Sequence, residues 1–144
     1  MLRYVAFIAV LFVSCAALAQ EPAPPHPVAE TIVDGAFTIR PAEYVFYKFT
    51  VPADVTEVTV RGRFEASGAS GNDVEVYVFD EDGYAKWQNG REARPYHASG
   101  RVTQANVEAK LPSHEGTYYL VFSNRFSVEA NKAVTADMSI GYFE

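Results

Sequence analysis

The feature that most constrains the fold is the strict alternation of apolar and polar residues near the C-terminus. Apolar side chains occupy every second position from residue 134 to residue 142: Val134, Ala136, Met138, Ile140 and Tyr142. Tyr118, Leu120 and Phe122 lie on one face of the segment before it. A period of two places such side chains on one face of a β-strand. We therefore expect two β-strands here, each with one buried face.

The same alternation recurs earlier in the chain, between turns rich in Gly, Pro and Asn. It covers residues 43–51, 58–64, 74–78 and 107–111. We expect a hairpin turn at residues 80–83, a short strand at 84–87 and a long loop over residues 91–100. No helix is expected beyond the N-terminal segment. The pattern predicts an all-β fold, a single antiparallel and jelly-roll-like β-sandwich of about 7–8 strands.

The N-terminal segment has the pattern of a secretory signal peptide. Arg3 precedes an apolar run that ends in Ala17-Leu18-Ala19, a typical cleavage motif. The run is shorter than the roughly 20 residues of a membrane span, which disfavours the alternative of a membrane anchor. We predict a signal peptide at residues 1–19, a proline-rich linker at 20–28 and the sandwich at 29–144. The mature chain is expected in the periplasm or outside the cell, without a transmembrane segment.

Lipid anchoring through Cys15 is the alternative processing route. Residues 11–15 resemble a bacterial lipobox, although Phe12 stands where leucine is usual and the apolar run continues beyond Cys15. The mass of the exported chain distinguishes a diacylglyceryl Cys15 from a first residue at Gln20. Cys15 is the only cysteine, so a chain cleaved after Ala19 has no disulfide and no thiolate site.

Charge and motifs exclude several classes of function. The net charge is −6, and Lys and Arg form no basic cluster of the kind that nucleic-acid binding requires. Neither a G-x-S-x-G nor an H-E-x-x-H motif occurs, and the histidines are His26, His97 and His114. We therefore expect a protein that is not an enzyme, has no cofactor and binds no nucleic acid.

Two sets of residues are candidates for ligand binding. Asn72, Asp73 and Glu75 carry side-chain oxygens of the type that calcium prefers, and the alternative is that Asn72 and Asp73 cap a turn. The aromatic candidates are Tyr77, Phe79, Trp87 and Tyr96. If exposed, they would form a platform for a sugar or an anchor for a protein. The alternative is that the second sheet or the long loop covers them.

A third set follows the strand at residues 118–122. Asn124 and Ser127 stand where side chains can satisfy backbone groups left by the departing strand, and Phe126 between them is expected to anchor the loop in the core. Lys132 begins the last strand, where its ammonium group can donate to loop carbonyls. We interpret all four residues as structural rather than catalytic.

This terminal motif resembles that of the GOLD (Golgi dynamics) domain. The residues that carry the resemblance are Gly116, Tyr118, Leu120, Phe122, Asn124, Phe126 and Ser127, followed by Lys132 and Val134, with weaker matches at residues 60–64, 68–71 and 73–78. GOLD domains are β-sandwiches of cargo receptors and of some phospholipid-transfer proteins, so the resemblance implies a module that recognises protein or lipid. Trafficking is not carried over, because no coiled coil or transmembrane helix is expected to follow. The strands at 71–78 and 116–119 also resemble those of bacterial pre-peptidase C-terminal domains.

The sequence thus predicts an exported, non-catalytic module that binds a protein, a lipid or a glycan. A small exported hydrolase or a calcium-dependent accessory domain is the alternative.

Overall fold

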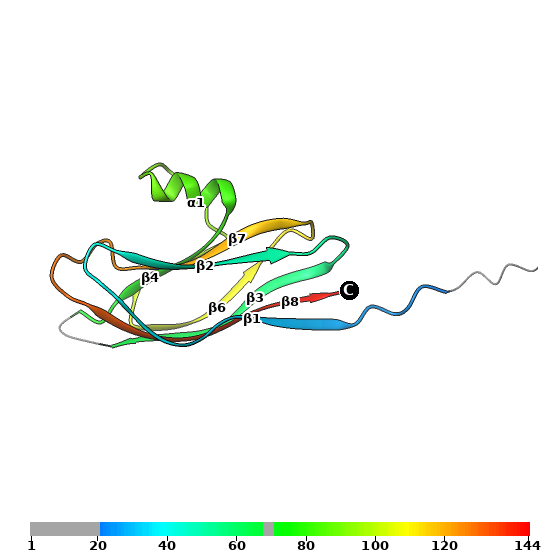
Figure 1. Cartoon of the computed structure of the whole chain (residues 1–144), viewed down its shortest axis with the longest axis horizontal. Helices are drawn as coiled ribbons and strands as arrows, with labels where there is room; N and C mark the ends of the chain where they lie inside the picture. Colours follow the sequence, from blue (N-terminus) through cyan, green and yellow to red (C-terminus); the bar gives the residue numbers. More distant parts are fainter. Residues whose placement is uncertain (1–20, 68–70) are drawn as a thin grey trace, which may run out of the picture.

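The computed structural model describes residues 21–67 and 71–144 (Figure 1). The predicted signal peptide, with Cys15, lies outside these residues, as do residues 68–70 of the predicted loop. The described part forms eight strands and one helix: β1 (Pro27–Ile39), β2 (Tyr44–Val51), β3 (Thr56–Ser67), β4 (Val74–Asp80), α1 (Glu81–Gln88), β5 (His97–Val102), β6 (Gln104–Lys110), β7 (Gly116–Ser123) and β8 (Lys132–Phe143).

The strands form two antiparallel sheets that face each other as two layers (Figure 1). Their orders are β1-β8-β3-β6 and β2-β7-β4-β5. The pairs β1–β8, β2–β7, β3–β6 and β4–β5 are nested within one another and alternate between the sheets. This is the arrangement of a jelly roll, and it confirms the predicted antiparallel β-sandwich.

The core lies between the two layers and is filled by alternate residues of each strand. The five apolar residues at even-numbered positions from 134 to 142 of β8 are all buried, as their spacing predicts. Phe122 of β7 joins the layers, with its ring edge-on to Phe37 and Phe64 at centroid distances of 5.1 and 6.0 Å. Burial of one such side chain stabilises the fold by roughly 1.5–3 kcal/mol, so the sandwich is held mainly by its apolar interior.

Helix α1 replaces the hairpin turn and the strand predicted at residues 80–87. Asp80 caps the helix, since its Oδ1 accepts a hydrogen bond from the Gly83 amide at 2.6 Å. Glu81 and Asp82 follow in the first turn, where negative charge is stabilised by the helix dipole. Lys86 then pairs with Asp82 at 2.6 Å. The prediction of no helix was wrong because these capping and charge interactions stabilise a helix, although the aromatic residues of this segment favour a strand.

The end of α1 is closed by Gly90. Its φ of +69° is the left-handed conformation that suits glycine after a helix. The Gly90 amide donates to the Trp87 carbonyl at 3.1 Å, and the Arg91 amide donates to the Lys86 carbonyl at 2.8 Å. These two hydrogen bonds end the helix, turn the chain sharply and place Arg91 beside the last turn of α1.

Helix α1 covers the outer face of the sheet β2-β7-β4-β5 (Figure 1). The Tyr84 ring stacks on Tyr119 of β7 with centroids 4.1 Å apart and an interplanar angle of 7°. Phe79 and Val121 are buried beneath the same helix. Strand β7 is therefore covered on both faces, by the core on one side and by α1 on the other.

Two predicted boundaries differ from those observed. Strand β1 begins at Pro27, inside the predicted linker at residues 20–28, because it pairs with the end of β8 as far as Phe143. Strand β5 begins at His97, inside the predicted loop at residues 91–100, and pairs with β4. Within residues 21–67 and 71–144, no helix has the length and apolar character needed to cross a membrane.

Candidate functional site

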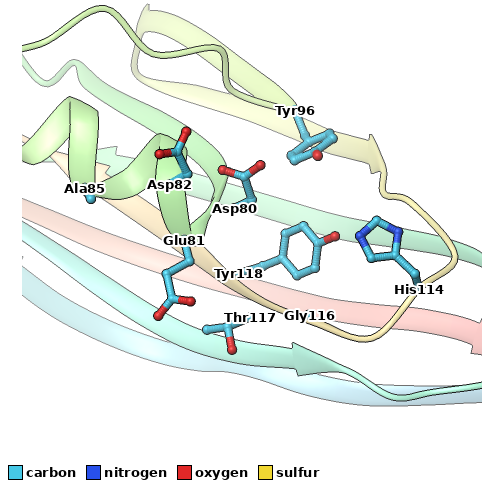
Figure 2. A pocket seen from close by; sticks show the side chains of 9 residues that line it. All are labelled: Asp80, Glu81, Asp82, Ala85, Tyr96, His114, Gly116, Thr117 and Tyr118. Atoms are coloured by element: carbon cyan, nitrogen blue, oxygen red, sulfur yellow. The ribbon is translucent and has the colours of Figure 1, made fainter.

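An open pocket of about 530 Å³ lies where three connections meet at one end of the second sheet (Figure 2). Asp80 comes from the junction of β4 and α1, and Tyr96 immediately precedes β5. His114 lies in the connection between β6 and β7, and Tyr118 belongs to β7. The fold therefore brings side chains from distant parts of the sequence to one concave site.

The Asp80 carboxylate is the centre of this pocket. One of its oxygens caps α1 through the Gly83 amide, and Figure 2 shows the carboxylate beside the rings of Tyr96 and Tyr118. Burial raises the pKa of Tyr96, and the charge of Asp80 with its hydrogen bond to the phenol adds to that rise. The Tyr118 ring stands edge-on to Tyr96 at 5.8 Å. Carboxylate and phenols thus hold one another in place.

The rim of the pocket is acidic and partly aromatic. Glu81 and Asp82 add two exposed carboxylates, and Tyr96 as a whole residue remains 38% exposed. Carboxylates accept hydrogen bonds from hydroxyl and ammonium groups, and an aromatic face packs against the C–H groups of a ligand. The pocket can therefore bind a polyhydroxylated or amine-bearing ligand, and it disfavours an anionic one.

The four aromatic candidates do not form the exposed platform that the strand pattern suggested. Phe79 is only 1% exposed, because α1 rather than a sheet or loop covers it. Tyr77 is half-buried, and its hydroxyl donates to Glu75 at 3.1 Å. Burial and the Glu75 charge raise the pKa of Tyr77 to about 12. Trp87 lies on α1 and packs on Tyr77, so only Tyr96 lines the acidic pocket.

The calcium candidates face basic side chains rather than a common cation site. Asp73 pairs with the Lys132 ammonium at 3.3 Å, and Glu75 pairs with Arg101 at 3.4 Å. The Asn72 Oδ1 atom is buried without a partner among the described residues. Across the described ranges, no group of three or more His, Cys, Asp or Glu side chains could hold a metal ion. A protein ammonium group therefore stands beside Asp73, where the calcium hypothesis placed a metal.

Asn124 ties together three segments of backbone. Its Nδ2 donates to the carbonyls of Ile39, Arg40 and Ala130 at 3.3, 3.1 and 2.8 Å. The residue is completely buried, and its backbone carbonyl accepts a hydrogen bond from the Ala42 amide. These contacts support the structural interpretation of Asn124, since they join the β1–β2 turn to the loop before β8.

The other motif residues differ in detail from expectation. Ser127 bonds to the Ala130 backbone through its hydroxyl, as a structural role requires. Lys132 was expected to donate to loop carbonyls, but its hydrogen bond goes to the Asp73 carboxylate. Phe126 was expected in the core and is only half-buried, with the Arg101 guanidinium 4.2 Å from its ring centroid. The motif therefore stabilises the loop partly through charge and not only through backbone hydrogen bonds.

His97 gives the fold a testable dependence on pH. Its Nε2 atom is buried without a partner in the described part of the chain, and burial lowers its pKa. The folded state disfavours the charged imidazole. The stabilising contribution is therefore complete above the unfolded pKa of about 6.5 and is lost as the pH falls below it. We expect the melting temperature to fall less between pH 7 and pH 5 in His97→Gln than in the parent. The exposed His114→Gln is the control, and an unchanged pH dependence in His97→Gln would contradict this account.

Comparisons with known proteins do not assign a role to the site. No protein-family model matches the chain, and no curated protein matches it either. The GOLD and pre-peptidase resemblances therefore remain expectations. Asp80 and His114 were considered in the sequence but were not assigned to a site, and no local pattern joins either of them to Tyr118. The acidic run at residues 80–82 was the available signal, and it was assigned to the hairpin turn expected at residues 80–83.

Proposed function

We propose that this chain is an exported, non-catalytic module that binds a glycan in the pocket at the N-terminal end of α1. The observation that carries the proposal is the exposed Tyr96 ring beside the carboxylates of Asp80, Glu81 and Asp82. An aromatic face packs on the apolar face of a sugar, and carboxylates accept hydrogen bonds from its hydroxyl groups. Export is part of the proposal and rests on the pattern of residues 1–19.

A binding role fits the partners of these carboxylates better than proton transfer does. Asp80 is held by the Gly83 amide, and Asp82 is paired with Lys86. Both groups are fixed as hydrogen-bond acceptors by the structure itself. A pre-positioned acceptor loses little entropy when a ligand hydroxyl reaches it. The arrangement supports recognition of a sugar surface rather than cleavage of a glycosidic bond.

The charge of the pocket predicts which glycans bind. Three carboxylates line it, of which Asp82 is already paired with Lys86, and the chain carries a net charge of −6. An amino sugar contributes an ammonium group that each carboxylate attracts, whereas a uronic acid is repelled. We therefore expect the order amino sugar, then neutral sugar, then acidic sugar in affinity for this pocket.

The experiment is an NMR titration of the mature chain with the tetramers of glucosamine and of N-acetylglucosamine. We expect both to shift the amide signals of residues 80–82 and 116–118, and the glucosamine tetramer to bind more tightly. Tyr96→Ala should weaken binding about tenfold, which corresponds to a loss of about 1.4 kcal/mol. Tyr96→Phe should retain most of the affinity, because it keeps the ring.

Phe46→Ala is the matched control, since Phe46 on β2 is 47% exposed but is not among the residues that line the pocket. It should bind both tetramers as the parent does. Equal weakening by Phe46→Ala and Tyr96→Ala would show that binding is not at the pocket. A chain that binds neither tetramer would refute the proposed glycan ligand.

A further inference from the structure

A second concave site lies at the opposite end of α1. It has a volume of about 380 Å³, and its lining includes Trp87, Arg91, Arg125 and Phe126, which we call the arginine–aromatic cleft. Whereas the first pocket is acidic, this cleft carries two guanidinium groups. A helix of eight residues separates the two sites, a span of roughly 12 Å at 1.5 Å per residue.

Arg125 is fixed in the cleft, and none of the described carboxylates pairs with it. Its Nη1 donates to the Trp87 carbonyl at 3.3 Å, and its guanidinium carbon lies 4.7 Å from the centroid of the Trp87 ring. The position at the C-terminal end of α1 is favourable for a cation. One hydrogen bond leaves most of its N–H groups without a partner within residues 21–67 and 71–144. Arg125 is therefore oriented, and it is available to bind an anion.

Arg91 is placed by the closure of α1. Its amide donates to the Lys86 carbonyl at 2.8 Å, so its backbone position is fixed by the helix end. Its side chain is exposed, and it forms no ion pair or hydrogen bond with any described residue. Two guanidinium groups without carboxylate partners thus line one small cleft.

The carboxylate that lines the cleft is already neutralised. Glu75 accepts from the Arg101 Nε at 3.4 Å and from the Tyr77 hydroxyl at 3.1 Å. It therefore does not compensate the charges of Arg91 and Arg125. In a chain whose net charge is −6, this leaves a local surplus of positive charge.

We propose that the arginine–aromatic cleft binds the oxyanion of an acidic sugar, either a carboxylate or a sulfate ester. The planar guanidinium fork donates two parallel hydrogen bonds to such oxyanions. The Trp87 and Phe126 rings supply apolar contact for the sugar to which the anion is attached. This site is independent of the glycan pocket, and it selects the opposite charge.

Trp87 is the only tryptophan, so its fluorescence and its indole NMR signal report on the cleft directly. The probes are D-glucuronate, D-glucose 6-sulfate, D-glucose and inorganic sulfate. We expect the first two to shift the Trp87 signals and the last two to have little effect. Binding of only one of the two acidic sugars also supports the site and identifies which oxyanion it takes.

Arg91→Gln is the decisive variant, because the Arg91 side chain forms no hydrogen bond or ion pair with a described residue and its loss should not impair folding. We expect it to weaken binding about tenfold, the size of one charge-assisted hydrogen bond. Arg61→Gln is the control, since it removes the same charge from an exposed pair with Glu108 on the other sheet. Equal losses in the two variants, or full binding by Arg91→Gln, would overturn the proposal. So would inorganic sulfate that binds as well as glucose 6-sulfate, or a lack of binding by both acidic sugars.

Discussion

Replacement of Gly62 by alanine is expected to be the most damaging addition of a single methyl group. A Cβ atom at this position would lie 2.0 Å from the Asp137 carbonyl oxygen and 2.7 Å from the Met138 Cα. Both atoms belong to the backbone of β8, which pairs with β3 at this point. The two strands would have to separate, so we expect a loss of more than about 4 kcal/mol in the free energy of unfolding.

Gly35→Ala is a matched control for this prediction. Gly35 has a φ of +153° and Gly62 a φ of +156°, so alanine meets nearly the same backbone strain at both positions. Apart from Gly35 and its two chain neighbours, no atom of the described residues lies within 4 Å of the Cβ position at Gly35. We expect only the cost of strain there, about 1–3 kcal/mol. Urea denaturation of both variants measures the difference, and equal losses would show that the contact with β8 relaxes without cost.

The second large effect is expected at the Asp73–Lys132 pair. Lys132 is only 2% exposed, whereas the Asp73 side chain is 32% exposed. Asp73→Ala would leave a buried ammonium group without its counter-charge, which we expect to cost about 3 kcal/mol. Lys132→Met should cost less, because the remaining carboxylate can be hydrated and methionine keeps most of the buried volume.

A double-mutant cycle tests this asymmetry. The variant that carries both Asp73→Ala and Lys132→Met removes both charges, so it should recover much of the stability that Asp73→Ala loses. The free energies of unfolding in urea give the coupling between the two positions. Additive losses in the double variant would mean that the pair does not determine the stability of this loop.

The strands with one face in solvent were predictable from sequence. Polar residues on the exposed face alternate with apolar residues on the buried face, and this alternation is visible in the sequence. In β8 the residues between the buried apolar positions include the polar Thr135, Asp137 and Ser139, since the outer face of this strand meets water. Strand β7 is different: Tyr119 and Val121 are buried as well as Tyr118 and Leu120. The outer face of β7 is buried by α1. An apolar–polar alternation within β7 therefore does not distinguish its two faces.

Helix α1 was missed because it conflicts with local preference. Gly83 lies within it, and glycine destabilises a helix interior. The position nevertheless requires glycine, since a Cβ there would lie 2.9 Å from Asp80 Oδ1 and 3.2 Å from the Phe79 ring. The capping aspartate, the Asp82–Lys86 spacing and Gly90 were visible signals of a helix. The aromatic residues Tyr84 and Trp87 were interpreted as strand residues instead.

The candidate pocket was less predictable than the fold. Its residues come from the segments at 80–82, 96 and 114–118, which the jelly-roll topology brings together. Tyr96 could be singled out because it is an aromatic residue in a polar loop. Its neighbours Asp80 and His114 have no local pattern that links them, so their meeting depends on the pairing of distant strands.

The nested strand order has a consequence for the order in which the strands pair as the chain folds. The innermost pair, β4 with β5, encloses only residues 81–96, whereas the outermost pair joins Pro27 to Phe143. Short loops close at lower entropic cost than long ones, so pairing can proceed outward from β4 and β5 before the C-terminal strand is available. Strand β8 lies between β1 and β3 and is made last of the three. Until it emerges, β1 has no neighbour in its sheet, and its unpaired edge is open to other chains.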